Sequence, residues 1–207
     1  MTALDFVGPH EILSRLPHAS SLRVAVEAGC ILTDSGLVLD ADLSLSDVSE
    51  ADILVIPGAG NATSLKTHPN ILAWVRQIHQ TTTWTTSVCT GSLILGAAGI
   101  LNGIKATTHW AAFERLNSYG VKPTHARVVE DGKIMTAAGV SAGIDMALVL
   151  ASKVVGPEFA QTIQLGLEYD PNPPFDIGSP DKVPKEMKDK LKARMVSFFE
   201  EESSGHT

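Results

Sequence analysis

Short runs of strand-forming residues alternate with helical patterns along this chain, and that alternation limits the fold more than any other feature. The three clearest strand runs are residues 22–26, 53–56 and 84–88. Between the last two, residues 70–78 carry apolar side chains at helical spacing directly after Pro69, a residue that favours the first turn of a helix. Two strands joined by a crossover helix predict a mostly parallel sheet with helices on both faces. We therefore predict an α/β fold of the flavodoxin-like or Rossmann-like type.

The rest of the chain continues this alternation. A strand is expected over residues 105–109, a hairpin over 126–137 turning at Asp131-Gly132, and helices over 111–118, 141–155, 158–169 and 184–199. The Pro-rich segment 170–180 excludes regular structure. The length of 207 residues, with 44% hydrophobic side chains, predicts one domain over 1–207. Its core is expected over 1–180, and a C-terminal helix and tail over 181–207.

The beginning of the chain departs from this fold class, which normally opens with an apolar strand. Residues 1–9 have the character of a loop that leads into a helix over 9–16. The first strand of the sheet is therefore expected to be missing, which would leave a sheet edge that another segment has to cover.

Charge and hydropathy exclude several classes of partner. The net charge is −7 and the basic residues are dispersed except in 182–194, where acidic residues lie among them, so we expect no nucleic-acid partner. The longest apolar run, 93–101, is too short for a membrane span. The two cysteines form no CxxC pair, no secretory signal pattern opens the chain, and the seven histidines show no metal-ligand spacing. We therefore expect a cytoplasmic protein with no metal.

A single cysteine lies at the junction between the strand run 84–88 and the apolar helical pattern that begins at Leu93. A sharp strand-to-helix turn lifts the middle side chain, here Cys89, out of the sheet, and small neighbours leave room for a substrate. The positive end of the following helix is expected to favour the thiolate. Cys89 is thus a candidate nucleophile, although a small buried hydrophobe remains the alternative. We interpret Cys30, Trp74 and Trp84 as core residues.

Several motifs together give the chain a family resemblance. They are Cys89-Thr90-Gly91-Ser92, residues 97–103, Ala106-Thr107-Thr108-His109-Trp110, Ile56-Pro57-Gly58, Gly143-Ile144-Asp145, and Leu167-Glu168-Tyr169 with Pro173-Pro174-Phe175 and Gly178-Ser179-Pro180-Asp181. With these motifs the chain resembles the ThiJ/PfpI superfamily, a branch of the class I glutamine-amidotransferase-like fold, and within it most closely the isonitrile hydratases. The last of the motifs is the most specific to that branch.

The resemblance implies a site and a reaction. Cys89 would be the nucleophile and Asp5 its carboxylate partner, where many superfamily members have a glutamate. Together they would hydrate an isonitrile to an N-substituted formamide through a covalent thioimidate, with no metal or organic cofactor. Thr90 would offer its hydroxyl and N–H to the substrate or to water, and Gly58 and Ala59 would give backbone donors in the manner of an oxyanion hole.

Other positions in the resemblance carry weaker implications. Phe175 is expected to form a wall of the substrate pocket. His109 could serve as a base, as in amidotransferase-type relatives, but is expected instead to be a structural hydrogen-bonding residue. The chain has Ala59 and Ala137-Ala138 where relatives commonly have glycines, and an alanine at 59 would be strained if its φ had to be positive.

Two other functions stay open beside the hydratase. Cys89 could be the reactive group of a non-enzymatic redox or small-molecule sensor, or of a superfamily enzyme that acts on reactive carbonyls, although those relatives generally favour glutamate at the carboxylate position. A transcription regulator would need an appended helix-turn-helix domain. The superfamily also implies a homodimer, with the Asp5 segment and the loop around Phe175 as interface material.

Overall fold

The centre of the fold is a four-stranded sheet in the order β5-β6-β10-β9. These strands are β5 (Ile53–Ile56), β6 (Trp84–Val88), β10 (Ile134–Ala137) and β9 (Val128–Asp131). Strand β6 pairs in parallel with both β5 and β10, while β9 is antiparallel to β10. This computed structural model describes residues 1–60 and 68–201. The sheet is therefore mostly parallel, as predicted, and β6 lies inside it with a neighbour on each side.

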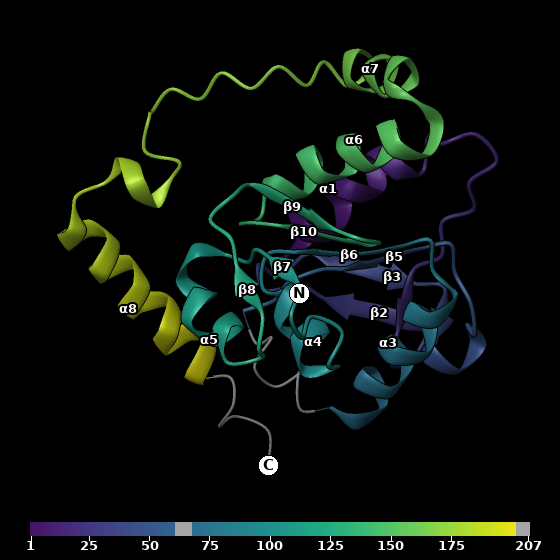
Figure 1. Ribbon diagram of the computed structural model, residues 1–207, viewed down its shortest axis with the longest axis horizontal. Helices are drawn as coiled ribbons and strands as arrows, with labels where there is room; N and C mark the ends of the chain where they lie inside the picture. Colours follow the sequence, from purple (N-terminus) through teal and green to yellow (C-terminus); the bar gives the residue numbers. More distant parts are fainter. Residues whose placement is uncertain (61–67, 202–207) are drawn as a thin grey trace.

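Helices cover both faces of the sheet (Figure 1). One face carries α1 (Ala3–Leu13), α6 (Ala142–Val155) and α7 (Pro157–Gly166), and the other carries α3 (Pro69–Thr81), α4 (Gly91–Ala97) and α5 (Phe113–Asn117). Neighbouring residues of a strand point to opposite faces, and β10 shows the result: Ile134 packs in the core of the α4 side and Met135 in the core of the α6 side. The α/β fold with helices on both faces is confirmed.

Small sheets and short helices complete the structure. The paired strands are β1 (Val24–Ala25) with β4 (Leu43–Ser44), β2 (Gly29–Leu32) with β3 (Val38–Ala41), and β7 (Lys105–Ala106) with β8 (Lys122–Pro123). The 3-10 helices are Leu45–Asp47, Trp110–Ala112 and Pro180–Lys182. The β2–β3 hairpin is antiparallel and has no counterpart in the sequence-based prediction. The strand expected over 105–109 is only two residues long, because residues 107–109 leave the ladder to approach the end of β6.

The prediction for the first residues is wrong. They form α1 from Ala3 onward instead of a loop, and the helix ends at Leu13. Pro9 lies inside α1 without ending it, because Pro9 is buried and packs close to Gly143 of α6. Helix α1 is the first element of the described residues. Asp5 is consequently held in the first turn of a packed helix.

The structure tests three predicted core residues and one predicted loop. Trp74 and Trp84 are partly buried against the two cores, and the Trp74 indole donates to the carbonyl of Val48 at 2.8 Å. Cys30 is exposed, so its core interpretation is wrong: its strand belongs to the two-stranded hairpin, one face of which is open to solvent. Residues 170–178 are irregular, as predicted, and all are exposed.

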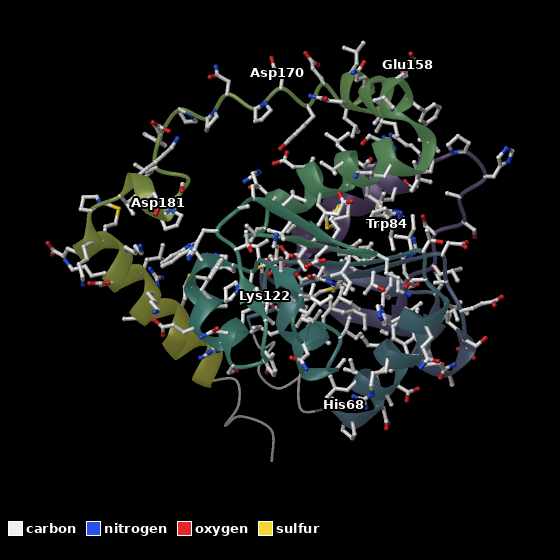
Figure 2. The ribbon with its side chains drawn as sticks, in the orientation of Figure 1. His68, Trp84, Lys122, Glu158, Asp170 and Asp181 are labelled. Atoms are coloured by element: carbon white, nitrogen blue, oxygen red, sulfur yellow. The ribbon has the colours of Figure 1, made fainter. Side chains whose placement is uncertain are left out.

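Residues 170–178 form an arm between α7 and α8 (Lys185–Glu201). In Figure 2, Asp170 marks the start of the arm and Asp181 marks the 3-10 helix that follows it, and the arm stands off the body of the molecule. Helix α8, which follows the arm, contacts the body of the molecule through an ion pair between Lys192 and Glu114 of α5 at 2.8 Å. Among the described residues no helix is long and apolar enough to cross a membrane.

Candidate active site

Cys89 occupies a sharp turn between β6 and α4. Its φ of 57° lies in the left-handed region that non-glycine residues seldom adopt. Hydrogen bonds hold this conformation on both sides. The Cys89 N–H donates to the carbonyls of Ala137 at 3.1 Å and Ala138 at 2.9 Å, and the Cys89 carbonyl accepts from the hydroxyls of Thr108 at 3.0 Å and Ser92 at 3.2 Å. The predicted elbow is therefore present and over-determined by its neighbours.

Asp5 reaches the elbow from the first turn of α1. Its side chain is fully buried, and Oδ2 accepts a hydrogen bond from the Gly58 N–H at 3.0 Å. Oδ1 has no hydrogen-bond partner among the residues that the structure describes. Burial raises the pKa of the Asp5 carboxyl to about 6, although the hydrogen bonds from Gly58 and from the Cys89 thiol oppose that rise. A carboxyl with this pKa can accept and return a proton near neutral pH.

The Cys89 sulfur accepts hydrogen bonds from the backbone N–H groups of Val140 and Thr90 and interacts with the Asp5 carboxyl. Burial raises the pKa of the thiol to about 12, and the negative charge of Asp5 adds to the rise. The Thr90 N–H at the start of α4 favours the thiolate, but the net shift is in the opposite direction, so the expected stabilisation of the thiolate is outweighed. With only 6% of Cys89 exposed, loss of water and the adjacent carboxylate outweigh the two N–H donors. The thiol keeps its proton next to a carboxylate that can take it.

Three consecutive N–H groups of residues 58–60 each donate to a different side chain, all at 3.0 Å. Gly58 donates to Asp5, Ala59 to the Thr90 hydroxyl, and Gly60 to Asp34. We call residues 58–60 the amide loop. The Thr90 hydroxyl also donates to the Ala59 carbonyl at 2.9 Å. The amides and hydroxyl that were predicted to face a substrate are thus engaged inside the protein, where they position Asp5 and Cys89.

Gly58, which matches the family motif, and Ala59, which departs from it, have different steric surroundings. A Cβ at Gly58 would lie 2.6 Å from Asp5 Oδ2 and 2.8 Å from the Thr90 nitrogen and hydroxyl, so only glycine lets the three segments meet. Ala59 is buried and is absent from the residues with positive φ. The alanine is therefore accommodated without backbone strain.

His109 lies beside the elbow and is almost completely buried, with 9% exposed. Its Nδ1 accepts a hydrogen bond from the Ala111 N–H at 3.2 Å, and its ring packs where a Cβ at Gly139 would lie, 2.9 Å from Cδ2. Burial lowers the pKa of the imidazole to about 4. His109 is thus neutral at physiological pH, caps the 3-10 helix Trp110–Ala112 and supports the segment that leads to Val140.

Phe175, predicted as a pocket wall, is 73% exposed in the arm. Within one chain it is not packed against the site. The start of the arm is anchored by Tyr169, whose hydroxyl donates to Asp145 of α6 at 2.8 Å, and Asp145 also pairs with Arg127. Two motifs of the resemblance, around Asp145 and around Tyr169, therefore meet in space next to the first turn of α6.

Sequence reasoning missed two parts of the site. One is the Val140 N–H, which carries no side-chain signal. The other is Asp34, in the turn between β2 and β3, whose sequence of Thr33, Asp34, Ser35 and Gly36 indicates only a turn. Among the described residues there is also no group of three His, Cys, Asp or Glu that could hold a metal ion.

The sequence of the chain is similar to those of several known proteins. The model of the DJ-1/PfpI family matches residues 1–153. An isonitrile hydratase of Pseudomonas putida is 41% identical over 191 residues, covering 92% of this chain and 84% of that protein. The transcriptional regulator CdhR of Pseudomonas aeruginosa is 30% identical over 77% of this chain and 48% of its own length.

The structural comparison agrees. The crystal structure of a ThiJ/PfpI family protein from Pseudomonas syringae has a TM-score of 0.92 and 35% identity, covering 97% of this chain and 84% of that one. The DJ-1 protein of Schizosaccharomyces pombe shares the fold, with a TM-score of 0.71 over 82% of this chain. Sequence and structure both lead to the same conclusion: the chain belongs to the DJ-1/PfpI family.

Proposed function

We propose that this protein hydrates an isonitrile, R–N≡C, to the N-substituted formamide. The observation that carries the proposal is the buried pairing of a thiol on a strained elbow with a carboxyl whose pKa lies near neutrality, Cys89 with Asp5. The 41% identity to an isonitrile hydratase over nearly the whole chain supports this choice of substrate class.

The first half of the reaction adds the thiol to the substrate. The Cys89 sulfur bonds to the terminal carbon of the isonitrile as its proton passes to Asp5, and Asp5 gives that proton to the same carbon. The product is the thioimidate R–N=CH–S–Cys89. A thiol that is protonated next to an ionised carboxylate suits this step, because the pair holds the one proton that the step consumes. The N–H groups of Val140 and Thr90 stabilise negative charge that develops on sulfur.

The second half returns the enzyme to its starting state. Water adds to the thioimidate carbon, one of its protons moves to nitrogen, and the C–S bond breaks to release R–NH–CHO. The remaining proton of the water returns to sulfur through Asp5. Each turnover consumes one isonitrile and one water, so the balance requires no oxidant, reductant or cofactor.

Turnover of para-nitrophenyl isocyanide by the full chain tests the proposal. We expect the formamide to form, to contain ¹⁸O when the reaction is run in H₂¹⁸O, and to disappear in Cys89→Ala. Mass spectrometry of acid-quenched protein is expected to show the thioimidate on Cys89. Folded protein that does not turn over alkyl or aryl isonitriles would overturn the proposal. Consumption of methylglyoxal in the same assay would then favour the reactive-carbonyl alternative, and inertness toward both would favour the sensor.

The homodimer and the cytoplasmic location remain predictions. Apolar side chains of the β2–β3 hairpin, Leu32, Leu37 and Val38, are at least half exposed, which is unusual for a surface that stays in water. Sedimentation equilibrium of the full chain gives its mass in solution and decides between one copy and two.

A further inference from the structure

Asp34 joins three segments that are far apart in the sequence. Its Oδ2 accepts hydrogen bonds from the Thr2 hydroxyl at 2.9 Å and from the Gly60 N–H at 3.0 Å. Its Oδ1 lies 3.1 Å from the amino group of Met1, and its own N–H donates to the Met1 carbonyl at 3.0 Å. The carboxylate therefore connects the β2–β3 turn, the start of α1 and the amide loop.

These are the segments that hold Asp5. Thr2 is the residue immediately before α1, and its N–H donates to the Gly58 carbonyl at 2.9 Å. Gly58 in turn donates to Asp5. Asp34 thus binds the amide loop at Gly60 and the start of α1 at Thr2. The amide loop supplies the donor of the Gly58–Asp5 hydrogen bond and α1 supplies its acceptor. A shift of Asp34 would move both partners of that bond.

Asp34 also acts on Asp5 through its charge. The groups that face the Asp5 carboxyl are the Cys89 thiol, the Asp34 carboxylate and, more weakly, the Met1 amino group. A second negative charge nearby disfavours ionisation of the first. Asp34 itself is well stabilised as an anion, because the Gly60 N–H, the Met1 amino group and the Thr2 hydroxyl lower its pKa against its partial burial. Asp34 therefore stays charged over the range in which Asp5 titrates.

We propose that Asp34 is a positioning residue for Asp5: its hydrogen bonds fix the amide loop against the start of α1, and its permanent negative charge disfavours ionisation of Asp5. This role deepens the proposed function and rests on it in one respect, the use of the Asp5 proton in the hydration reaction. The position and charge of Asp34 would matter equally for any reaction in which Asp5 exchanges a proton with Cys89.

The experiment is a ¹³C NMR titration of the Asp5 carboxyl in protein labelled at aspartate, assigned by the resonance lost in Asp5→Asn. Asp34→Asn removes the charge and keeps an oxygen acceptor. We expect it to lower the Asp5 midpoint by about half a pH unit, as expected for loss of a nearby like charge. Asp34→Glu keeps the charge and is expected to restore most of the shift. The matched control is Asp40→Asn, which removes the same charge from an exposed site on the same hairpin.

An Asp5 midpoint that is unchanged in Asp34→Asn, or shifted equally by Asp40→Asn, would overturn the proposal. If Asp34→Asn does not fold, the same titration is done on Asp34→Ser. This variant also keeps an oxygen acceptor without the charge. Because the titration needs no substrate, it separates the two proposals. A shifted midpoint in a protein that does not turn over isonitriles would support the role of Asp34 and overturn only the hydratase.

Discussion

Thr90 holds Ala59 by both of its backbone groups, accepting from the N–H at 3.0 Å and donating to the carbonyl at 2.9 Å. The residue after the nucleophile is thereby fastened to the middle of the amide loop. Because Gly58 on the same loop binds Asp5, the distance between nucleophile and carboxyl is set by backbone contacts on both sides. The Thr90 side chain thus holds the backbone of the site in place, while the Thr90 N–H donates a hydrogen bond to the Cys89 sulfur.

Replacement of Thr90 by valine, which has the same shape, is expected to loosen this framework. The variant leaves the buried N–H and carbonyl of Ala59 without their partner, at a cost of about 1–3 kcal/mol in the free energy of unfolding. We expect kcat/KM for the isonitrile to fall by roughly 10- to 100-fold, because a misplaced catalytic pair loses most of its advantage. Thr90→Ser keeps the hydroxyl and is expected to retain most of the activity. Equal kcat/KM in the valine and serine variants would contradict the framework role.

The raised pKa of the Cys89 thiol predicts slow alkylation. With the exposed Cys30 replaced by serine, we expect iodoacetamide at pH 8 to modify Cys89 far more slowly than it modifies Cys30 in a Cys89→Ser protein, because thiolate and access are both required. Asp5→Asn removes the negative charge that raises the pKa of Cys89, so it is expected to speed the modification of Cys89. Mass spectrometry over time measures both rates. Faster modification of Cys89 than of Cys30 would mean that the thiolate already exists in the free protein.

The central strands could be predicted from the sequence because their signals are local. Apolar and β-branched runs gave β5 and β6 with the bounds that the structure has, and Asp131-Gly132 gave the β9–β10 turn. The elbow at Cys89 followed from a strand run that ends where a helical pattern begins. Its protonation state did not follow, because the pKa of the thiol depends on burial and on a carboxylate 84 positions away in the sequence.

The parts that could not be predicted depend on contacts between distant residues. Asp34 binds Thr2 and Gly60, which lie 32 and 26 positions away, and its local sequence indicates only a turn. Residues 1–9 end in the pair Gly8-Pro9, which is typical of a loop, yet packing against α6 keeps residues from Ala3 onward helical. Cys30 was assigned to the core on residue type alone, although its strand has an open face.

Gly91 is expected to be irreplaceable for steric reasons. A Cβ at this position would lie 2.2 Å from the carbonyl oxygen of Ile56, because α4 begins where β5 ends and the two backbones touch. Gly91→Ala must displace backbone on one side, and we expect a loss of roughly 3 kcal/mol or more in the free energy of unfolding. Gly166→Ala, where nothing lies within 4 Å, is the matched control and is expected to be neutral. Urea denaturation of both variants gives the comparison, and similar midpoints would contradict the close approach.

The pKa of Asp5 predicts that the site destabilises the protein at neutral pH. The carboxyl titrates near 6 in the folded protein and near 3.8 in the unfolded chain, so the folded state binds the proton more tightly. The stability that this proton provides is complete below about pH 3.8 and is lost as the pH rises through 6, a difference of up to about 3 kcal/mol. Asp5→Asn cannot ionise and is expected to be more stable than the natural protein at pH 8, and this gap is expected to shrink to about 1 kcal/mol at pH 4.5. Urea denaturation at both pH values measures the gap. A gap of the same size at both pH values would show that the asparagine acts through packing and that burial does not hold a proton on Asp5.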